Sequence, residues 1–403
     1  MVAALSRPAA ASAAPGQPRR VTVLGAGPEG RALAAWLLAD GAVEVNLFTV
    51  YADELAVLAA GSVTLRGDGP IGTFRTGDGG IEVTSVLDAA VSDSDVLFVT
   101  GPVFKLRTYG MVLAPYLNEK QALVVCPAQT FGGLEVDWWL SAGGRTDPSV
   151  MIEMGSVPFE CQQIDGALHL RRRPGVAVGV RPAHRTGILA WLQGIFPDLE
   201  PRATVLHSSF ADGSGLVEVP ALIIGGPAIE GGERPLLPGA VPLTAGSFRQ
   251  LITPRVAEIA AAMADERRRV ATHFGVHDLP RTKDWIDQVA GGDAPAESRP
   301  IPDPEQATAM VRQGVLGSLV PLASAARLAG VPVPATKSII QVVATFLGAD
   351  LASAGRRLEN IGFSEADPDD VRRAVGVTGT LEVNRTKEIS RVKEDSRGSD
   401  SGR

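Results

Sequence analysis

Apolar residues recur along this chain with two different spacings. In the first half, short apolar runs alternate with segments in which apolar residues recur every three or four positions. We expect strands at residues 21–24, 43–48, 96–100 and 122–126, and helices at residues 53–60 and 109–117. Such alternation predicts βαβ units and therefore an α/β fold with a doubly wound parallel sheet, whose ligand crevice lies beyond the carboxyl ends of the strands.

After residue 204 the helical spacing dominates, which predicts a mainly α-helical second domain. Its clearest helix covers residues 254–274, because Pro254 suits the first turn and Gly275 suits the end. The apolar stripe of this helix contains Val256, Ile259, Met263, Val270 and Phe274.

A charge interrupts that apolar stripe. On a helical projection, Arg267 falls inside the stripe and Glu266 at its edge, whereas Asp265 points to the opposite side. Two interpretations stay open. Glu266 and Arg267 form a buried pair that fixes helix packing, or Arg267 binds a substrate carboxylate.

The most informative stretch is VTVLGAGPEGRALAAWLLADG, at residues 21–41. A G-x-G-x-x-G pattern joins its predicted strand to its predicted helix, and consists of Gly25, Ala26, Gly27, Pro28, Glu29 and Gly30. Gly25 permits the tight turn, Gly27 lets the backbone approach a pyrophosphate, and Gly30 lets the helix lie close to the strand. Because the helix N-terminus then points at the phosphates, the pattern favours a Rossmann-type dinucleotide site over a purely structural turn.

Two later loops also follow predicted strands. The first contains Thr100, Gly101 and Pro102, and the second covers residues 127–133 with Gln129. Since both loops fall at carboxyl ends of the sheet, we expect them to face the cofactor.

The end of the second strand bears on the choice between NAD and NADP. Thr49 lies there, and neither the carboxylate typical of NAD sites nor an arginine typical of NADP sites is present at that end. Because a hydroxyl tolerates a 2′-phosphate better than a carboxylate does, we lean slightly towards NADP, with Arg66 or Arg75 as the phosphate partner.

Composition and charge limit the kinds of partner that the protein can have, and changes of pattern along the chain suggest four units. With 403 residues, of which 45% are hydrophobic, the chain can fill two cores. A net charge of −7 argues against a nucleic-acid partner, and no apolar run is long enough to span a bilayer. We therefore expect a cytoplasmic enzyme with small-molecule partners, and a homodimer stays open. The expected units are a disordered leader (1–20), the nucleotide-binding domain (21–204), the helical domain (205–376) and a disordered tail (377–403).

Several reactive residue types have ordinary explanations. Cys126 and Cys161 lie in apolar or strand-like contexts without metal-ligand spacing, so we expect reduced cysteines and no metal. His207, on a strand-like segment at residues 203–210, is expected to be packed or hydrogen-bonded. The arginine run 171–173 is most simply a solvated turn.

Three segments besides the glycine turn resemble the opine dehydrogenases, the octopine and nopaline type, over roughly residues 21–363. They are IEMGSVPFEC (152–161), ITPRVAEIAAAMADERRRVATHFGV (252–276) and the segment 319–363, which begins with LVP and closes on a G-R-x-L pattern. The resemblance implies a second domain like the C-terminal helical domain of 6-phosphogluconate dehydrogenases. It also implies that an amino acid or amine condenses with a 2-oxo acid to an imine, which NAD(P)H reduces.

The departures from the family fall on its titratable residues. Residues 206–226 can be laid without gaps on the substrate motif N-x-N-P-x-x-H-P-P, so that Asp212 and Ser214 replace asparagines and Glu218 replaces the catalytic histidine. Gln313 and Gly314 stand where family members carry an acidic pair. The resemblance makes Glu218 and Asp212 the catalytic candidates, because a buried glutamate can transfer protons near neutrality, and Ser214 a substrate contact.

Two alternatives are kept. The loss of the histidine is also compatible with a redox-silent paralogue that binds the cofactor and regulates. Hydroxyacid dehydrogenases and ketopantoate reductases share the two-domain plan but use a lysine at the start of the second domain. No lysine lies between Lys120 and Lys283, which counts against them.

Overall fold

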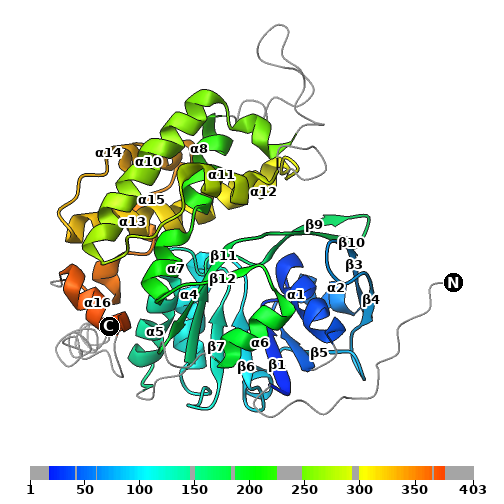
Figure 1. The fold of residues 1–403 in the computed structure, drawn as a ribbon. Helices are drawn as coiled ribbons and strands as arrows, with labels where there is room; N and C mark the ends of the chain where they lie inside the picture. The colour runs from blue at the N-terminus through cyan, green and yellow to red at the C-terminus, as the bar shows by residue number, and fades with distance from the viewer. Residues whose placement is uncertain are drawn as a thin grey trace, which may run out of the picture.

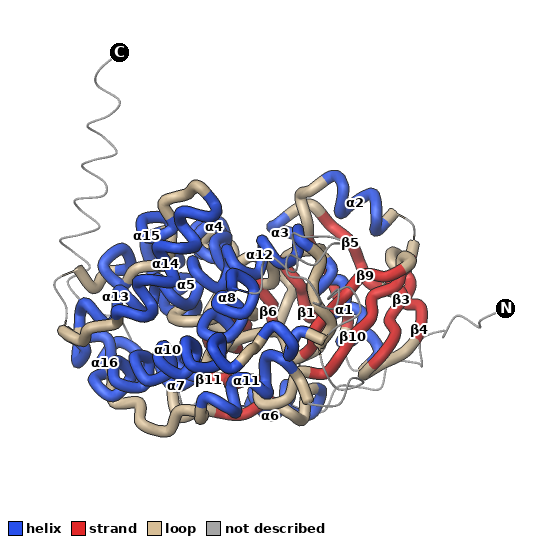
Figure 2. Tube along the Cα trace, turned by 90° about the horizontal axis from the view of Figure 1, so that it is seen from above, coloured by secondary structure: helices blue, strands red, loops and turns tan. Residues whose placement is uncertain are grey.

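The structure is a computed structural model that describes residues 18–40, 43–59, 61–145, 150–182, 187–224, 247–292, 299–364 and 367–376. An α/β part with two sheets comes first in the chain, and a helical part follows and packs on one end of it (Figure 1). Seen from above, the helical part and the strand-rich part lie side by side (Figure 2).

The α/β part alternates strands and helices as the sequence predicts. Its elements are β1 (Arg20–Leu24), α1 (Pro28–Ala39), β2 (Glu44–Phe48), α2 (Ala52–Leu58), β3 (Ser62–Gly67), β4 (Gly72–Arg75), β5 (Ile81–Thr84), α3 (Leu87–Val91), β6 (Val96–Val99), η1 (Val103–Lys105), α4 (Leu106–Leu113), β7 (Ala122–Val125), α5 (Gly132–Ala142), β8 (Val150–Met154), β9 (Phe159–Ile164), β10 (Ala167–Arg172), β11 (Val176–Arg181), α6 (Gly187–Ile195) and β12 (Leu199–Pro201).

The main sheet has eight strands in the order β12-β11-β8-β7-β6-β1-β2-β5. All neighbours from β8 to β5 are parallel, whereas β11 runs antiparallel to β8. Its central strands are buried along their whole length, as in β6 and β7, because helices cover both faces of such a sheet. The strand order reverses between β1 and β6, so the crevice of the doubly wound sheet lies beyond their carboxyl ends.

A second sheet, in the order β4-β3-β10-β9, was not expected from the sequence. It joins residues about a hundred positions apart, because β10 pairs in parallel with β3 and antiparallel with β9. Aromatic packing holds this sheet against α1, where the rings of Trp36 and Phe159 stack with centroids 5.6 Å apart. The second sheet thereby forms a wall beside the glycine turn.

The helical part begins with α7, directly after residue 204, where helical spacing replaces the strand–helix alternation of the sequence. Its elements are α7 (Val205–Ala211), α8 (Ser214–Ile224), η3 (Phe248–Leu251), α10 (Pro254–His273), α11 (Thr282–Ala290), α12 (Pro304–Gly314), the π-helical turn η4 (Val315–Leu319), α13 (Val320–Leu328), α14 (Pro334–Leu347), α15 (Leu351–Ala354), η5 (Leu358–Ile361) and α16 (Pro368–Gly376). Helix α10 has the predicted bounds within one residue, and its predicted stripe is buried except for the half-buried Ile259.

The strand expected at residues 203–210 is wrong, because this segment forms α7. Thr204 caps the helix by accepting a hydrogen bond from the Leu206 N–H, which the apolar run alone does not reveal. The helix packs closely on β11, where a Cβ placed on Gly179 would lie 2.7 Å from the Val205 Cα. Within the described ranges, no single helix has both the length and the hydrophobicity to cross a membrane, although α14 and the segment Leu351–Ile361 pass that test as one bent pair.

Candidate active site

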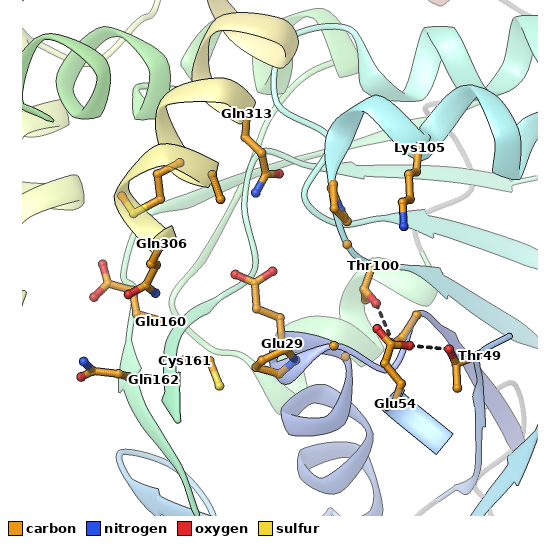
Figure 3. A pocket seen from close by; sticks show the side chains of 18 of the residues that line it. Glu29, Thr49, Glu54, Thr100, Lys105, Glu160, Cys161, Gln162, Gln306 and Gln313 are labelled. Atoms are coloured by element: carbon orange, nitrogen blue, oxygen red, sulfur yellow. Dashed lines mark hydrogen bonds between the residues drawn. The ribbon is translucent and has the colours of Figure 1, made fainter. Parts of the chain in front are cut away.

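A cavity of about 780 Å³ lies beyond the carboxyl ends of β1, β2 and β6 and extends between the second sheet and α12 (Figure 3). Its walls therefore come from both parts of the molecule. The glycine turn forms one wall, and Gln306, Met310 and Gln313 of α12 lie opposite. This is the position that the doubly wound topology predicts for a ligand.

The three glycines of the turn have the backbone geometry that the pattern predicts. Gly25 has a φ of +113°, and a Cβ on Gly30 would lie 1.9 Å from the Gly25 carbonyl oxygen, so neither position accepts a side chain. A Cβ on Gly27, by contrast, would meet only the Glu54 carboxylate, at 3.9 Å. Gly27 thus faces open space beside the first-turn amides of α1, which have no acceptors within the helix, and this cradle fits a pyrophosphate.

Most residues that we expected to face the cofactor line this cavity: Gly25, Gly27, Pro28, Glu29, Gly30, Thr49, Thr100, Gly101 and Pro102. Ala26 is an exception, because its methyl group is buried in the core. Gln129 is also an exception. It is buried and does not line the cavity; its φ is +53°, and its Nε2 donates to the Ser214 Oγ at 3.3 Å.

The end of the cavity near β2 holds an acidic side chain that the sequence analysis missed. Glu54, in the first turn of α2, lines the cavity and accepts a hydrogen bond from the Thr49 hydroxyl (Figure 3). Lys105 also lines this end, and its Nζ donates to the Tyr51 hydroxyl at 2.6 Å. Arg66 and Arg75, the expected phosphate partners, are exposed on β3 and β4 and do not line the cavity.

An ion-pair cluster lies at the opposite end, on the strands β9 and β10. Glu160 and Arg171 are direct cross-strand neighbours, and an oxygen of Glu160 accepts from the Arg171 Nη2 at 2.7 Å. Arg173 also reaches Glu160, at 3.4 Å, and its Nε is buried without a hydrogen-bond partner. Burial alone would raise the pKa of Glu160, but Arg299, Arg173 and Arg171 together lower it. The run 171–173 is therefore not a solvated turn, because two of its three arginines line the cavity.

Glu218 lies behind this cluster rather than in the wall of the main cavity. It is buried on α8, and its Oε1 accepts from the Arg299 Nη1 at 2.6 Å. Arg299 itself lines the main cavity and lies 3.5 Å from Glu160. Burial lowers the pKa of Arg299, but Glu160 and Glu218 more than offset that effect and raise it. An arginine therefore stands between Glu218 and the space that a substrate can fill.

The other residues of the substrate motif gather near Glu218. Asp212, Ser214 and Glu218 line a small second cavity, and Arg173 borders both this cavity and the main one. Asp212 Oδ1 accepts from the Ser214 hydroxyl at 2.6 Å, while its Oδ2 is buried without a partner. The three residues thus lie together, but outside the lining of the main cavity.

Glu29 is the carboxyl group in the centre of the main cavity. It is half-buried in the first turn of α1, and its side chain projects from the glycine turn into the cleft (Figure 3). Burial raises the pKa of Glu29, and the charges of Arg173 and Arg299 oppose this rise. A raised pKa makes this carboxylate a better proton acceptor than an ordinary glutamate.

Arg267 does not line the cavity. It is completely buried, and it donates to the Ser318 hydroxyl at 2.7 Å, to the Thr130 hydroxyl at 3.3 Å and to the carbonyl oxygens of residues 209 and 210. Glu266 is engaged elsewhere, because its carboxylate accepts from the first-turn amides of α14 at Ala335 and Thr336. The geometry favours the packing interpretation, although the two residues do not pair with each other.

Arg356, the arginine of the closing G-R-x-L segment, has a similar position. It is buried, its Nε donates to Glu135 at 2.7 Å, and its Nη1 donates to the carbonyl oxygens of Ala128, Thr130 and Gly317. Arg267 and Arg356 therefore both connect the loop after β7 to the π-helical turn η4. His207 is hydrogen-bonded as expected, with Nδ1 2.9 Å from the Thr204 hydroxyl.

The sequence contains a signal for the cluster that the analysis missed. Glu160 and Gln162 alternate along β9, and His169 and Arg171 alternate along β10, so all four project to one face. All four line the cavity. Such an alternation predicts a strand with one polar, solvent-facing side. Only the pairing of β10 with β3 brings that side to the glycine turn.

The sequence and the fold are similar to those of known proteins. No family model matches the chain. It is 26% identical to the opine dehydrogenase of Arthrobacter sp. (strain 1C) over 373 residues, which cover 88% of this chain and 98% of that protein. Its fold is similar to that of octopine dehydrogenase in complex with NADH and agmatine, with a TM-score of 0.65 and 18% identity over 90% of this chain and all of that one.

Two further solved structures show the range of this fold. NADP⁺-bound yersinopine dehydrogenase has a TM-score of 0.58 and 17% identity over 88% of this chain and 97% of that one. A putative ketopantoate reductase from Ralstonia solanacearum has a TM-score of 0.56 and 18% identity over 83% and 100%. The chain is therefore similar in sequence, over nearly its full length, to an opine dehydrogenase, and similar in fold to octopine dehydrogenase.

Proposed function

We propose that the protein is an NAD(P)H-dependent reductase of the opine dehydrogenase type, which joins an amine or amino acid to a 2-oxo acid. One observation carries the proposal. A single cavity connects the open cradle at Gly27 to an arginine cluster around Glu160, so a dinucleotide and a carboxylate-bearing substrate have room side by side. The same combination disfavours a redox-silent regulator, because a protein that binds only the cofactor needs no second polar subsite.

The reaction determines what these residues must do. The amine nitrogen attacks the carbonyl carbon of the oxo acid, protons pass to the carbonyl oxygen, and water leaves to give an imine. A reduced nicotinamide supplies the hydride that adds to the imine carbon, and the nitrogen keeps the C=N electron pair and a proton. The site must therefore hold one carboxylate, provide a proton donor for the departing oxygen and exclude water.

The arginines supply the carboxylate subsite. Arg173 and Arg299 both line the main cavity and both lie close to Glu160. Guanidinium groups bind carboxylates with paired charge-assisted hydrogen bonds. Glu160 and Glu218 hold the two guanidinium groups in place, so we assign Glu218 a positioning role through Arg299. We assign the role of proton donor to Glu29, because its side chain projects into the centre of the cavity.

A panel assay tests the proposal. The protein is mixed with NADH or NADPH, a 2-oxo acid such as pyruvate and a series of amino acids and amines, and cofactor oxidation is followed with mass analysis of the product. An N-(carboxyalkyl) product confirms the function. Reduction of the oxo acid alone, to a hydroxy acid, would contradict it and favour the hydroxyacid dehydrogenase alternative.

Two variants then test the roles. Arg173→Met should raise KM for the oxo acid by about 10- to 100-fold with an unchanged cofactor Kd. Arg172→Met is the matched control, because its side chain pairs with Asp198 outside the cavity. Glu218→Gln should raise the same KM, whereas a fall in kcat of about 10² to 10⁴ with unchanged KM would show that Glu218 itself transfers the proton.

A further inference from the structure

We propose that Glu54 binds the adenosine ribose of the cofactor and makes the protein prefer NADH to NADPH. The inference rests on the proposed function, since it concerns the cofactor of the same site. It reverses the preference that the residues at the end of β2 suggest, because those residues alone do not show which side chain reaches the ribose.

The position of the Glu54 carboxylate carries the argument. Its Oε1 would lie 3.9 Å from a Cβ on Gly27, the residue that leaves room for the pyrophosphate. Its Oε2 accepts from the Thr49 hydroxyl at the end of β2, which fixes the carboxylate at the edge of the cavity. A ribose that follows the pyrophosphate away from Gly27 along this edge meets Glu54 (Figure 3).

A carboxylate at this point discriminates between the two cofactors. It can accept hydrogen bonds from both ribose hydroxyls of NADH, and such charge-assisted bonds are stronger than neutral ones. With NADPH it faces the 2′-phosphate, so one donor is lost and two negative charges are brought together. Thr49, which we took as tolerant of a phosphate, instead donates its hydroxyl hydrogen to Glu54.

The cations around the cavity do not compensate for that repulsion. Arg171, Arg173 and Arg299 gather around Glu160, which lies on the other side of Glu29 from Glu54 (Figure 3). Of the described residues, Lys105 is the basic side chain that lines the Glu54 end. Its Nζ is hydrogen-bonded to the Tyr51 hydroxyl and lies 4.3 Å from the centroid of that ring.

The test compares binding affinities by titration of the intact protein with NADH and NADPH, without turnover. The wild type should bind NADH at least about tenfold more tightly than NADPH, since hydrogen bonds to charged groups have about that effect. Glu54→Gln should weaken NADH binding by about tenfold and narrow the ratio of the two Kd values. Asp53→Asn is the matched control, because Asp53 is the exposed neighbour in the same turn and lies outside the cavity.

The outcomes separate the inference from the function on which it rests. Equal Kd ratios in Glu54→Gln and Asp53→Asn would overturn the role of Glu54. A wild type that prefers NADPH, and loses this preference in Lys105→Met, would assign the 2′-phosphate to Lys105 and also overturn it. Both results leave the reductase proposal intact, whereas binding of neither cofactor would overturn the function and the inference together. Titration with ADP-ribose and its 2′-phosphorylated form should reproduce the ratio, since the effect belongs to the ribose.

Discussion

Replacement of Arg267 by methionine distinguishes an architectural arginine from a substrate-binding one. The guanidinium is fully buried and has four hydrogen-bond acceptors, two hydroxyls and two backbone carbonyls. Methionine fills much of the same volume but donates nothing. The hydroxyls of Thr130 and Ser318 can rotate to other partners, but the carbonyls of Ser209 and Phe210 cannot.

The magnitude follows from those two carbonyls. Each buried carbonyl that loses its donor costs about 1–3 kcal/mol. Relief from burying a cation offsets part of this sum, because burial lowers the pKa of Arg267 to about 10 and so disfavours its charged form. We expect a net loss of about 3 kcal/mol in the free energy of unfolding, which lowers Tm by roughly 6–12 °C.

Thermal and urea unfolding measure the loss, with Arg255→Met as the control on the same helix. Arg255 is exposed and pairs only with Glu258, so its replacement should change stability by less than about 0.5 kcal/mol. Kinetics below the transition should show an unchanged KM for the oxo acid in Arg267→Met. A Tm within about 2 °C of the wild type, together with a raised KM, would refute the architectural role.

Three further predictions concern other residues. Gly27→Val should abolish binding of both nicotinamide cofactors with near-normal folding, since its side chain enters the open cradle; unchanged affinities would contradict the pyrophosphate site. Burial raises the pKa of Glu153 to about 7 in the folded state, from its ordinary value of 4.5. At pH values between these two, the folded state holds a proton that the unfolded state has released. This group should therefore lower stability by about 2.5 kcal/mol between pH 5 and pH 8, and Glu153→Gln should unfold in urea without that decrement; an identical pH slope in both proteins would disprove it. Arg356→Met should lower Tm by roughly 4–10 °C, because the carbonyls of Ala128 and Thr130 lose the Arg356 donor, whereas Gly317 keeps the Thr130 N–H; scanning calorimetry that shows no loss would contradict this.

Local patterns predicted the parts of the fold that local interactions determine. The glycine turn, the central strands and α10 have their own signals in spacing, capping and turn residues, and the structure confirms them. Helix α7 was mistaken for a strand, since seven residues with a capping threonine carry too little periodicity to separate the two.

The site was harder to predict, because its residues meet through long-range pairing. Glu54 is six residues beyond β2, so a rule that examines only the end of that strand misses it. Arg173 follows β10 and Arg299 lies in the segment before α12, so only the folding of the second sheet against the helical part brings both to Glu160. Neither Arg173 nor Arg299 belongs to a sequence motif that predicts a substrate-binding site.

The segments that resemble the opine dehydrogenases have an architectural role here rather than a chemical one. Glu266 accepts the first amides of α14, Arg267 connects α7 and the loop after β7 to η4, and Arg356 holds that loop from the other side. A chain can keep these contacts, and hence the shape of the cleft, while the side chains that face the substrate change. The resemblance at Arg267 and Arg356, and the departure from it at Glu218, agree with this division between architecture and substrate contact. Under the proposed function, we therefore expect substitutions in the cluster of Glu160, Arg173 and Arg299, rather than in those segments, to change which oxo acid and amine are used.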